Sequence, residues 1–254
     1  MNKEIEKIIV EYVAAYPKIK GTQTTWKTPI IGIARADHSK FDQLKSSVQE
    51  THLTPKELLS SGESVIAFFL PFQEEIALSN KDGLRPSRAW AVAYIETNTL
   101  IGELSQHLIA YLKGRGYEGE TVSATHNFDE ATLMSDWSHR HVAEITGIGK
   151  FGLNNMLITD SGCAGRVGSV VTSMCLESTA VDDRPTCLYH MNGTCGLCVD
   201  RCPQSAFEGG FNRFKCYELL LDNDAYYDDL GLVDVCGKCC VALPCTFGNP
   251  CKNK

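Results

Sequence analysis

The stretch Cys195-Gly-Leu-Cys198-Val-Asp-Arg-Cys202-Pro203 decides how the C-terminal part of this 254-residue chain is interpreted. Its spacing, C-x2-C-x3-C-P, matches the last three positions of the cysteine signature with which bacterial ferredoxins hold [4Fe–4S] clusters. Each such cluster takes four cysteine thiolates from the protein. The stretch therefore predicts cluster ligands at its cysteines.

Further cysteines complete two sets of four around this stretch. Where the ferredoxin signature has its first cysteine, this chain has Asn192, and the nearest upstream cysteine is Cys187. A surface loop tolerates about five extra residues at a small cost in closure entropy. Cys187 is therefore the expected ligand, with His190 in the same loop as the alternative. Because the cysteine before the proline crosses to the other cluster in two-cluster ferredoxins, we assign one cluster to Cys187, Cys195, Cys198 and Cys245, and the other to Cys202, Cys216, Cys236 and Cys239.

Cysteine-rich segments have two other common uses. C-x2-C pairs also bind zinc, but a zinc site has no use for the crossing cysteine. A secreted disulfide scaffold is disfavoured because residues 1–160 contain no cysteine. We interpret Cys163 and Cys175 as ordinary small core residues. Cys240 and Cys251 stay unassigned.

The cysteine distribution also divides the chain into two predicted domains. Residues 1–180 alternate between helical and strand-like patterns, which predicts an α/β domain with a mixed sheet. Residues 181–254 are rich in loops and cysteine, which predicts a ferredoxin-like domain with two clusters. The expected fold class is therefore α+β.

Composition and charge narrow the function classes. Hydrophobic residues make up 43% of the chain, enough for a buried core, and the net charge of −7 argues against a nucleic-acid groove. The longest apolar run, residues 65–70, is too short to span a bilayer. No apolar signal-peptide core follows the charged N-terminus. We expect a cytoplasmic protein that does not bind a membrane.

Local patterns place the elements of the first domain. Thr54, Pro55 and Glu57 form a capping signature at the start of a helix. Ser161 and Gly162 predict a turn that joins two strands into a pair. The predicted strands are residues 29–34, 64–70, 156–159 and 167–172, and the predicted helices are residues 39–50, 54–59, 87–113 and 136–146.

The segment Gly147-Ile-Gly149-Lys150-Phe-Gly152 matches G-x-G-x-x-G. The dinucleotide-binding form of this motif needs a strand before it and a helix after it. Here a polar, helix-like segment precedes the motif and a strand-like segment follows it, so we reject a dinucleotide site. We expect the glycines to turn the chain tightly or to let the backbone pass close to a bulky cofactor.

Several segments resemble one enzyme family. Residues 143–159 (AEITGIGKFGLNNMLIT) resemble the AGLG-x-x-GKN-x-L-LI segment of epoxyqueuosine reductases, and residues 53–71 resemble a second segment of that family. The cysteine module also resembles that of reductive dehalogenases. The resemblance extends over about residues 29–245. It implies a cobalamin in the first domain, close to Gly147, Gly149, Lys150 and Gly152, that receives electrons through the clusters.

The chain departs from that family in two ways. Full epoxyqueuosine reductases continue into a helical repeat domain that helps to hold tRNA, whereas this chain ends at Lys254. Together with the negative charge, this shortened form argues against a tRNA partner. The proton-donating Asp of the family also has no clean match. Asp129 and Asp136 are the candidate catalytic residues, with a turn and a helix cap as their alternative roles.

The sequence therefore predicts an iron–sulfur oxidoreductase that passes electrons through two [4Fe–4S] clusters to a cobalamin. It does not identify the substrate that is reduced. The alternative is a non-catalytic electron-transfer or corrinoid-handling protein that serves a partner. Expected partners are an electron donor such as ferredoxin or flavodoxin, and a small molecule or a corrinoid protein.

Overall fold

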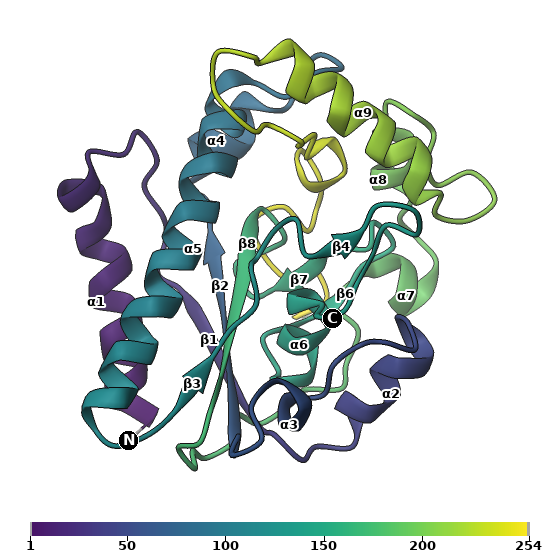
Figure 1. The fold of residues 1–254 in the computed structure, drawn as a ribbon. Helices are drawn as coiled ribbons and strands as arrows, with labels where there is room; N and C mark the ends of the chain where they lie inside the picture. Colours follow the sequence, from purple (N-terminus) through teal and green to yellow (C-terminus); the bar gives the residue numbers. More distant parts are fainter. Residues whose placement is uncertain (1, 253–254) are drawn as a thin grey trace.

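A four-stranded sheet lies between two sets of helices in the computed structural model, which describes residues 2–252 (Figure 1). The sheet has the order β1 (Ile30–Arg35), β2 (Ser64–Pro71), β8 (Gly165–Thr172), β3 (Gly119–Glu120). Two smaller sheets pair β4 (Phe128–Asp129) with β5 (Met134–Ser135) and β6 (Gly149–Phe151) with β7 (Leu157–Thr159). The helices are α1 (Asn2–Lys20), α2 (Lys40–Ser47), α3 (Pro55–Leu58), α4 (Glu74–Ser79), α5 (Arg88–Gly114), α6 (His139–Ile145), α7 (Leu188–Asn192), α8 (Leu197–Asp200), α9 (Arg213–Tyr226) and the 3-10 helix η1 (Lys238–Cys240).

Strand β2 is buried along its whole length because helices cover both faces of the sheet. Its side chains alternate between two core clusters, as the two-residue repeat of a strand requires. Ile66, Phe68 and Leu70 belong to the cluster that includes α1 and α5. Val65, Ala67 and Phe69 belong to the cluster that includes α2 and α6. The continuous apolar run in the sequence thus corresponds to a strand with two buried faces.

The predicted capping signature of α3 is confirmed. The Thr54 side chain accepts a hydrogen bond from the Glu57 backbone, and the Glu57 carboxylate accepts one from the Thr54 backbone at 2.7 Å. These two bonds satisfy donors that the first turn of a helix leaves free. They fix where the chain turns back toward β2.

The sheet is antiparallel at every pairing, so the expectation of a mixed sheet is wrong, although the combination of helices and sheet is confirmed. The register pairs Arg35, the last residue of β1, with Ser64, the first residue of β2. The connection through α2 and α3 therefore returns the chain to the end of the sheet at which β1 stopped. A crossover that leads to a parallel neighbour would have had to bring it back to the opposite end.

The predicted pairing of residues 156–159 with residues 167–172 is also wrong. Strand β7 pairs with β6, and β8 pairs with β2 and β3. A single bridge between Thr159 and Gly162 marks the turn. Beyond that turn β8 joins the central sheet, where its apolar residues Val170 and Val171 are fully buried.

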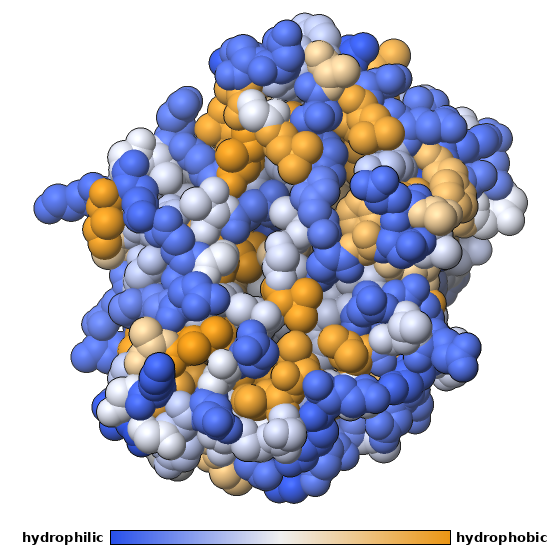
Figure 2. All heavy atoms as spheres, in the orientation of Figure 1, coloured by the Kyte–Doolittle hydropathy of each residue, from blue (hydrophilic) through white to orange (hydrophobic). Residues whose placement is uncertain are grey.

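The cysteine-rich part of the chain is built from short helices and loops that lie beside the sheet (Figure 1). Helix α9 was not predicted from the sequence; its first turn is capped by the Asn212 side chain, which accepts hydrogen bonds from the backbone of Phe214 and Lys215. Orange apolar side chains reach the surface at the end of the molecule where α9 lies (Figure 2). Among the described residues, no helix has the length and apolar character needed to cross a membrane.

Candidate metal centre

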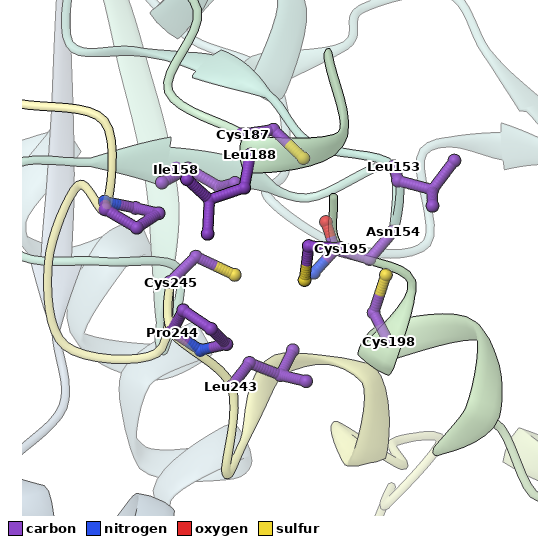
Figure 3. A pocket seen from close by; sticks show the side chains of 11 residues that line it. Leu153, Asn154, Ile158, Cys187, Leu188, Cys195, Cys198, Leu243, Pro244 and Cys245 are labelled. Carbon is purple, nitrogen blue, oxygen red and sulfur yellow. The ribbon is translucent and has the colours of Figure 1, made fainter. Parts of the chain in front are cut away.

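Four of the predicted ligands line one pocket: Cys187, Cys195, Cys198 and Cys245 (Figure 3). The pocket has a volume of about 340 Å³, part of which is open to solvent. Apart from Asn154, its other lining residues are apolar: Leu153, Ile158, Leu188, Leu243, Pro244 and Pro250. The fold thus brings together thiols from positions up to about sixty residues apart in the sequence, in the group of four that the spacing predicted.

Helix α7 explains the widened spacing after Cys187. Cys187 is the N-cap of α7, and Gly193 ends the helix in a left-handed conformation with φ of 75°. The residues that this chain has in addition to the ferredoxin signature therefore form a helical turn instead of an irregular loop. His190 lies on this turn, is exposed and does not line the pocket, whereas Cys187 is buried and does.

Electrostatic interactions connect the cysteines of the second predicted group: Cys202, Cys216, Cys236 and Cys239. Burial is the largest cause that raises the pKa of Cys216 to about 12, and charges on Cys239, Cys236 and Cys202 contribute to the same rise. Burial likewise raises the pKa of Cys236 to about 11, with Cys239 and Cys202 contributing to the rise. Helix α9 supplies Cys216, and the loop that leads into η1 supplies Cys236.

The two groups are neighbours. Burial raises the pKa of Cys198 to about 11, and the next contribution comes from Cys239 of the second group, ahead of Cys187 and Cys195 of its own group. Cys198 lies within α8 and Cys202 follows the same helix. One short helix thus sends one thiol to each group, which is the arrangement that the crossing cysteine of a two-cluster signature produces.

The four thiols of the first group line a pocket and do not meet at a point. Within residues 2–252, no three His, Cys, Asp or Glu side chains are placed so that they could hold a single metal ion. Buried thiols with raised pKa values favour the neutral form. A cationic iron–sulfur core would stabilise the thiolates, because metal coordination deprotonates a thiol outright.

The thiol of Cys163 adjoins the first group, which the sequence did not reveal. Cys163 is buried in the main core, as predicted, but its sulfur lies 4.0 Å from the Cys245 sulfur and donates to the Cys240 carbonyl. Asn154, which lines the pocket, donates to the Cys239 carbonyl at 2.7 Å. The predicted core position of Cys175 is wrong, because Cys175 follows β8 where the chain leaves the sheet and is exposed.

The glycine-rich segment is explained largely by packing within the chain. Gly147 has φ of 83°, so it turns the chain after α6 in a conformation that favours glycine. A side chain at Gly149 would collide with the carbonyl of Ile158, and one at Gly152 would press on the Ile158 side chain. The ammonium of Lys150 lies 3.4 Å from Asp183. The glycines therefore let β6 approach β7 closely, which places Ile158 in the wall of the cysteine pocket.

The two candidate acids both have structural hydrogen bonds. The Asp136 carboxylate accepts hydrogen bonds from Gln49 at 2.6 Å and from Thr51 at 2.5 Å. The Asp129 carboxylate accepts one from the Thr132 backbone at 2.8 Å, which closes the turn between β4 and β5 and lowers the pKa of Asp129. Neither residue lines the cysteine pocket.

Two arginines, Arg140 and Arg166, interact electrostatically with each other, and Arg140 also interacts with cysteines of the second group. Desolvation by neighbouring protein atoms lowers the pKa of Arg140, and the positive charge of Arg166 contributes to the same decrease. Part of the Arg140 side chain is nevertheless exposed to solvent. Charges on Cys240, Cys239 and Cys216 act on Arg140 in the opposite direction. The Arg166 guanidinium stacks 4.4 Å above the ring of Tyr94, and its Nε atom is buried without a hydrogen-bond partner among the described residues. Tyr94 in turn donates a hydrogen bond to the buried carboxylate of Asp234.

Comparison with known proteins identifies one group of relatives. No protein-family model matches the chain. The chain is 27% identical over 224 residues to the epoxyqueuosine reductase of Staphylococcus aureus (strain NCTC 8325 / PS 47), a match that covers 78% of this chain and 54% of the relative. The chain thus spans about half the length of that curated relative.

Solved structures share the fold. An epoxyqueuosine reductase with an epoxyqueuosine-modified tRNA stem loop superposes with a TM-score of 0.60 at 21% identity, over 93% of this chain and 64% of the other. A catabolic reductive dehalogenase in complex with 3-bromo-4-hydroxybenzoic acid superposes with a TM-score of 0.61 at 14% identity, over 87% of this chain and 30% of the other. The chain therefore resembles epoxyqueuosine reductases in sequence, and it shares a fold with them and with reductive dehalogenases.

These matches contradict the expectation that tRNA is not a partner. That expectation rested on the negative charge of the chain and on the position of its last residue. A structure with the same fold holds a tRNA stem loop, and the curated relative is also an epoxyqueuosine reductase. Net charge averages over the whole surface, so it does not exclude a local site for RNA.

Proposed function

From this resemblance in sequence and fold, we propose that the chain is an iron–sulfur reductase that acts on epoxyqueuosine in tRNA. Electrons would pass through two [4Fe–4S] clusters to a cobalamin. The observation that carries the proposal is the pocket lined by four cysteines, next to the second cysteine group, in a chain with this resemblance. Conversion of an epoxide to an alkene consumes two electrons and two protons and releases water, and two clusters that each carry one electron match that demand.

We assign the clusters as the cysteine spacing predicted. One is held by Cys187, Cys195, Cys198 and Cys245 and the other by Cys202, Cys216, Cys236 and Cys239, in a ferredoxin-like unit that spans residues 181–254. The apolar walls of the first pocket support this assignment, because exclusion of water and burial are the means by which a protein tunes a cluster. The adjacency of Cys198 and Cys239 supports electron transfer between the two clusters.

The region around Arg140 and Arg166 is the place that we propose for the cobalamin. The unpartnered Nε of Arg166 and the accessible guanidinium of Arg140 offer donors to the amide oxygens of a corrinoid. When bound, a corrinoid supplies a low-valent cobalt that reduces the substrate. The segment with Gly147, Gly149, Lys150 and Gly152 would act indirectly, since its glycines set the position of β7.

Proton delivery is assigned to the loop that carries Asp129 and Asp136. Both carboxylates are exposed, so either one can exchange protons with water. Replacement of each acid by Asn retains its shape and most of its hydrogen bonds. A loss of turnover in Asp129→Asn or Asp136→Asn, with iron content unchanged, would identify the donor.

The test combines composition with turnover. Protein purified without oxygen is incubated with hydroxocobalamin, desalted and analysed for iron and cobalt; it is then given tRNA that contains epoxyqueuosine and a chemical reductant. We expect about eight irons and one cobalt per chain, and nucleoside mass spectrometry should show loss of the epoxide oxygen. Cys198→Ser should abolish turnover, whereas Cys175→Ser, which changes an exposed cysteine outside both groups, should retain it.

A non-catalytic electron carrier is the second candidate. It is favoured by the structural hydrogen bonds that Asp129 and Asp136 both make. This candidate predicts about eight irons and rapid oxidation of the reduced clusters by an acceptor protein, with no change in the tRNA. Iron content near zero would contradict both candidates.

A further inference from the structure

Lys238 lies between two ligands of the second group and is one of the largest fully buried side chains of the molecule. It occupies the third position of the segment Cys236-Gly-Lys-Cys239, and only 2% of its surface is exposed. Its ammonium donates hydrogen bonds to the carbonyls of Asn80 at 2.9 Å and Asp82 at 2.7 Å. Lysine is almost never fully buried without a paired charge, so this placement calls for an explanation.

Within the described part of the chain, no carboxylate forms an ion pair with this ammonium. The ion pairs among residues 2–252 do not include Lys238. The charged groups that act on it are Cys236, Arg201 and Asp82, and Arg201 carries the same sign of charge. A buried ammonium that has hydrogen bonds but no ionic partner is destabilising, because burial removes the charge from water. Asp82 is the one carboxylate in this group, and it attracts the ammonium without forming an ion pair with it.

The surroundings hold Lys238 firmly in this position. The carbonyls that it binds follow the C-terminal end of α4, where the helix leaves carbonyls without partners and carries partial negative charge. Arg201 donates to the Lys238 carbonyl at 3.2 Å and to the Lys81 carbonyl at 2.6 Å. The side chain of Asn80 donates to the Cys236 carbonyl at 2.9 Å. The same turn after α4 thus holds the lysine and the loop that carries the ligands.

We propose that Lys238 is the counter-charge of the cluster held by Cys236 and Cys239, and that it raises the reduction potential of that cluster. The proposal rests on the proposed function, because it requires the cluster. Four thiolates outweigh the positive charge of the iron–sulfur core, so the cluster is an anion, and one-electron reduction adds a further negative charge. A cation fixed nearby in a region of low dielectric favours the reduced form.

The test compares variants that separate charge from shape. Lys238→Gln keeps a donor for the two carbonyls but removes the charge, and Lys238→Arg keeps the charge. Lys215→Met is the matched control, because Lys215 adjoins the ligand Cys216 but is exposed, so that solvent screens its charge. Each holoprotein is titrated without oxygen with dithionite, which supplies the electron, and the reduced clusters are followed by EPR spectroscopy.

In Lys238→Gln, we expect the equilibrium constant for reduction of one cluster to fall on the order of tenfold, which equals about 59 mV for a one-electron couple. The other cluster, Lys238→Arg and Lys215→Met should retain potentials close to those of the unmodified protein. Full iron content with an unchanged potential in Lys238→Gln would overturn the proposal and leave the proposed function intact. Absence of iron from the unmodified protein would instead remove the proposed function.

A second measurement decides the case in which Lys238→Gln does not retain its cluster. The thermal stabilities of the cluster-free proteins are compared for Lys238→Gln, Lys238→Met and the unmodified chain. If the ammonium lacks its counter-charge in the cluster-free state, both variants unfold at the same or a higher temperature. If Lys238 serves only to hold the loop through its hydrogen bonds, both variants unfold at a lower temperature, and the proposal is wrong.

Discussion

Single residues decide which thiols can meet. Cys187 and His190 are close in sequence and both are possible ligands by chemistry, but the helix that begins after Cys187 turns only the cysteine into the pocket. A single contact also fixes the loop that carries Cys236 and Cys239. The buried hydrogen bond from Lys238 to the Asn80 carbonyl joins this loop to the turn after α4, which lies 158 residues away in the sequence. Ligand identity thus follows from where a side chain is held.

Replacement of Cys187 tests this assignment. Cys187→Ser should reduce the iron content by up to half, because one cluster of two loses a thiolate ligand. His190→Ala should leave the iron content unchanged, since His190 is exposed and outside the pocket. Iron analysis with EPR spectroscopy measures both results. Loss of iron in His190→Ala but not in Cys187→Ser would exchange the two assignments.

His139 predicts a dependence of stability on pH. Burial lowers the pKa of His139 to about 4, and the neutral ring bonds Ser169 at 2.8 Å. Because its unfolded pKa of about 6.5 is higher, the unfolded state binds more protons between these values. The contribution of His139 is therefore fully present above about pH 6.5, and up to about 3 kcal/mol is lost as the pH falls toward 4.

Denaturant unfolding from pH 7 to pH 4 measures this effect. His139→Gln should reduce the slope of unfolding free energy against pH, while it lowers stability at pH 7. His38→Gln is the control, because His38 is exposed. Equal slopes in His139→Gln and the unmodified protein would show that His139 is not the group responsible.

At the scale of elements, close approach between strands connects the fold to the site. Strand β6 lies against β7 without side chains at Gly149 and Gly152, and β7 carries Ile158 into the pocket wall. Side chains of strand β2 pack into both core clusters. The same strands that make the core therefore position the wall of the metal site.

A pair of Gly→Ala variants tests this coupling. In Gly149→Ala the new methyl group would meet the backbone of Ile158, which cannot yield as a side chain can, so we expect a loss of stability of about 1–3 kcal/mol. Gly102 lies within α5 with open space around it. Gly102→Ala should therefore stabilise the protein by up to about 1 kcal/mol. Thermal or denaturant unfolding measures both, and a stabilised Gly149→Ala would contradict the packing argument.

At the scale of the whole molecule, the cysteine groups tie distant parts of the chain together. Cys245 lies near the end of the chain, yet its carbonyl accepts a hydrogen bond from Cys163 at 2.9 Å, and its thiol faces Cys187, Cys195 and Cys198. Val241 belongs to the core cluster that includes α1 and α5. Bound clusters would therefore stabilise the cysteine-rich segment against the sheet.

Removal of iron tests the dependence of this segment on its metal. Chelation under oxidising conditions should increase hydrogen exchange and proteolysis in residues 187–251, because the thiol groups lose the centre that holds them. The central sheet should stay protected, since β2 is buried on both faces. Equal protection of the segment with and without iron, measured by hydrogen exchange, would contradict the expected coupling.

The sequence by itself predicted the chemistry of the site and determined many local elements. Cluster ligands recur at short, fixed spacings, so C-x2-C-x3-C-P marked Cys195, Cys198 and Cys202 without further help. Capping is also local, and Thr54 with Glu57 therefore predicted the start of α3. Continuous apolar runs predicted the buried strand β2 for the same reason.

Only the tertiary structure decided which strands pair and which distant groups meet. Strand pairing depends on the path of the connection, which is why the sheet is antiparallel and β7 joins β6. The approach of Cys163 to Cys245 and the burial of Lys238 between α4 and the ligand loop join residues far apart in sequence. No local pattern encodes such contacts, because they arise when packing of the whole core brings separate segments into the same space.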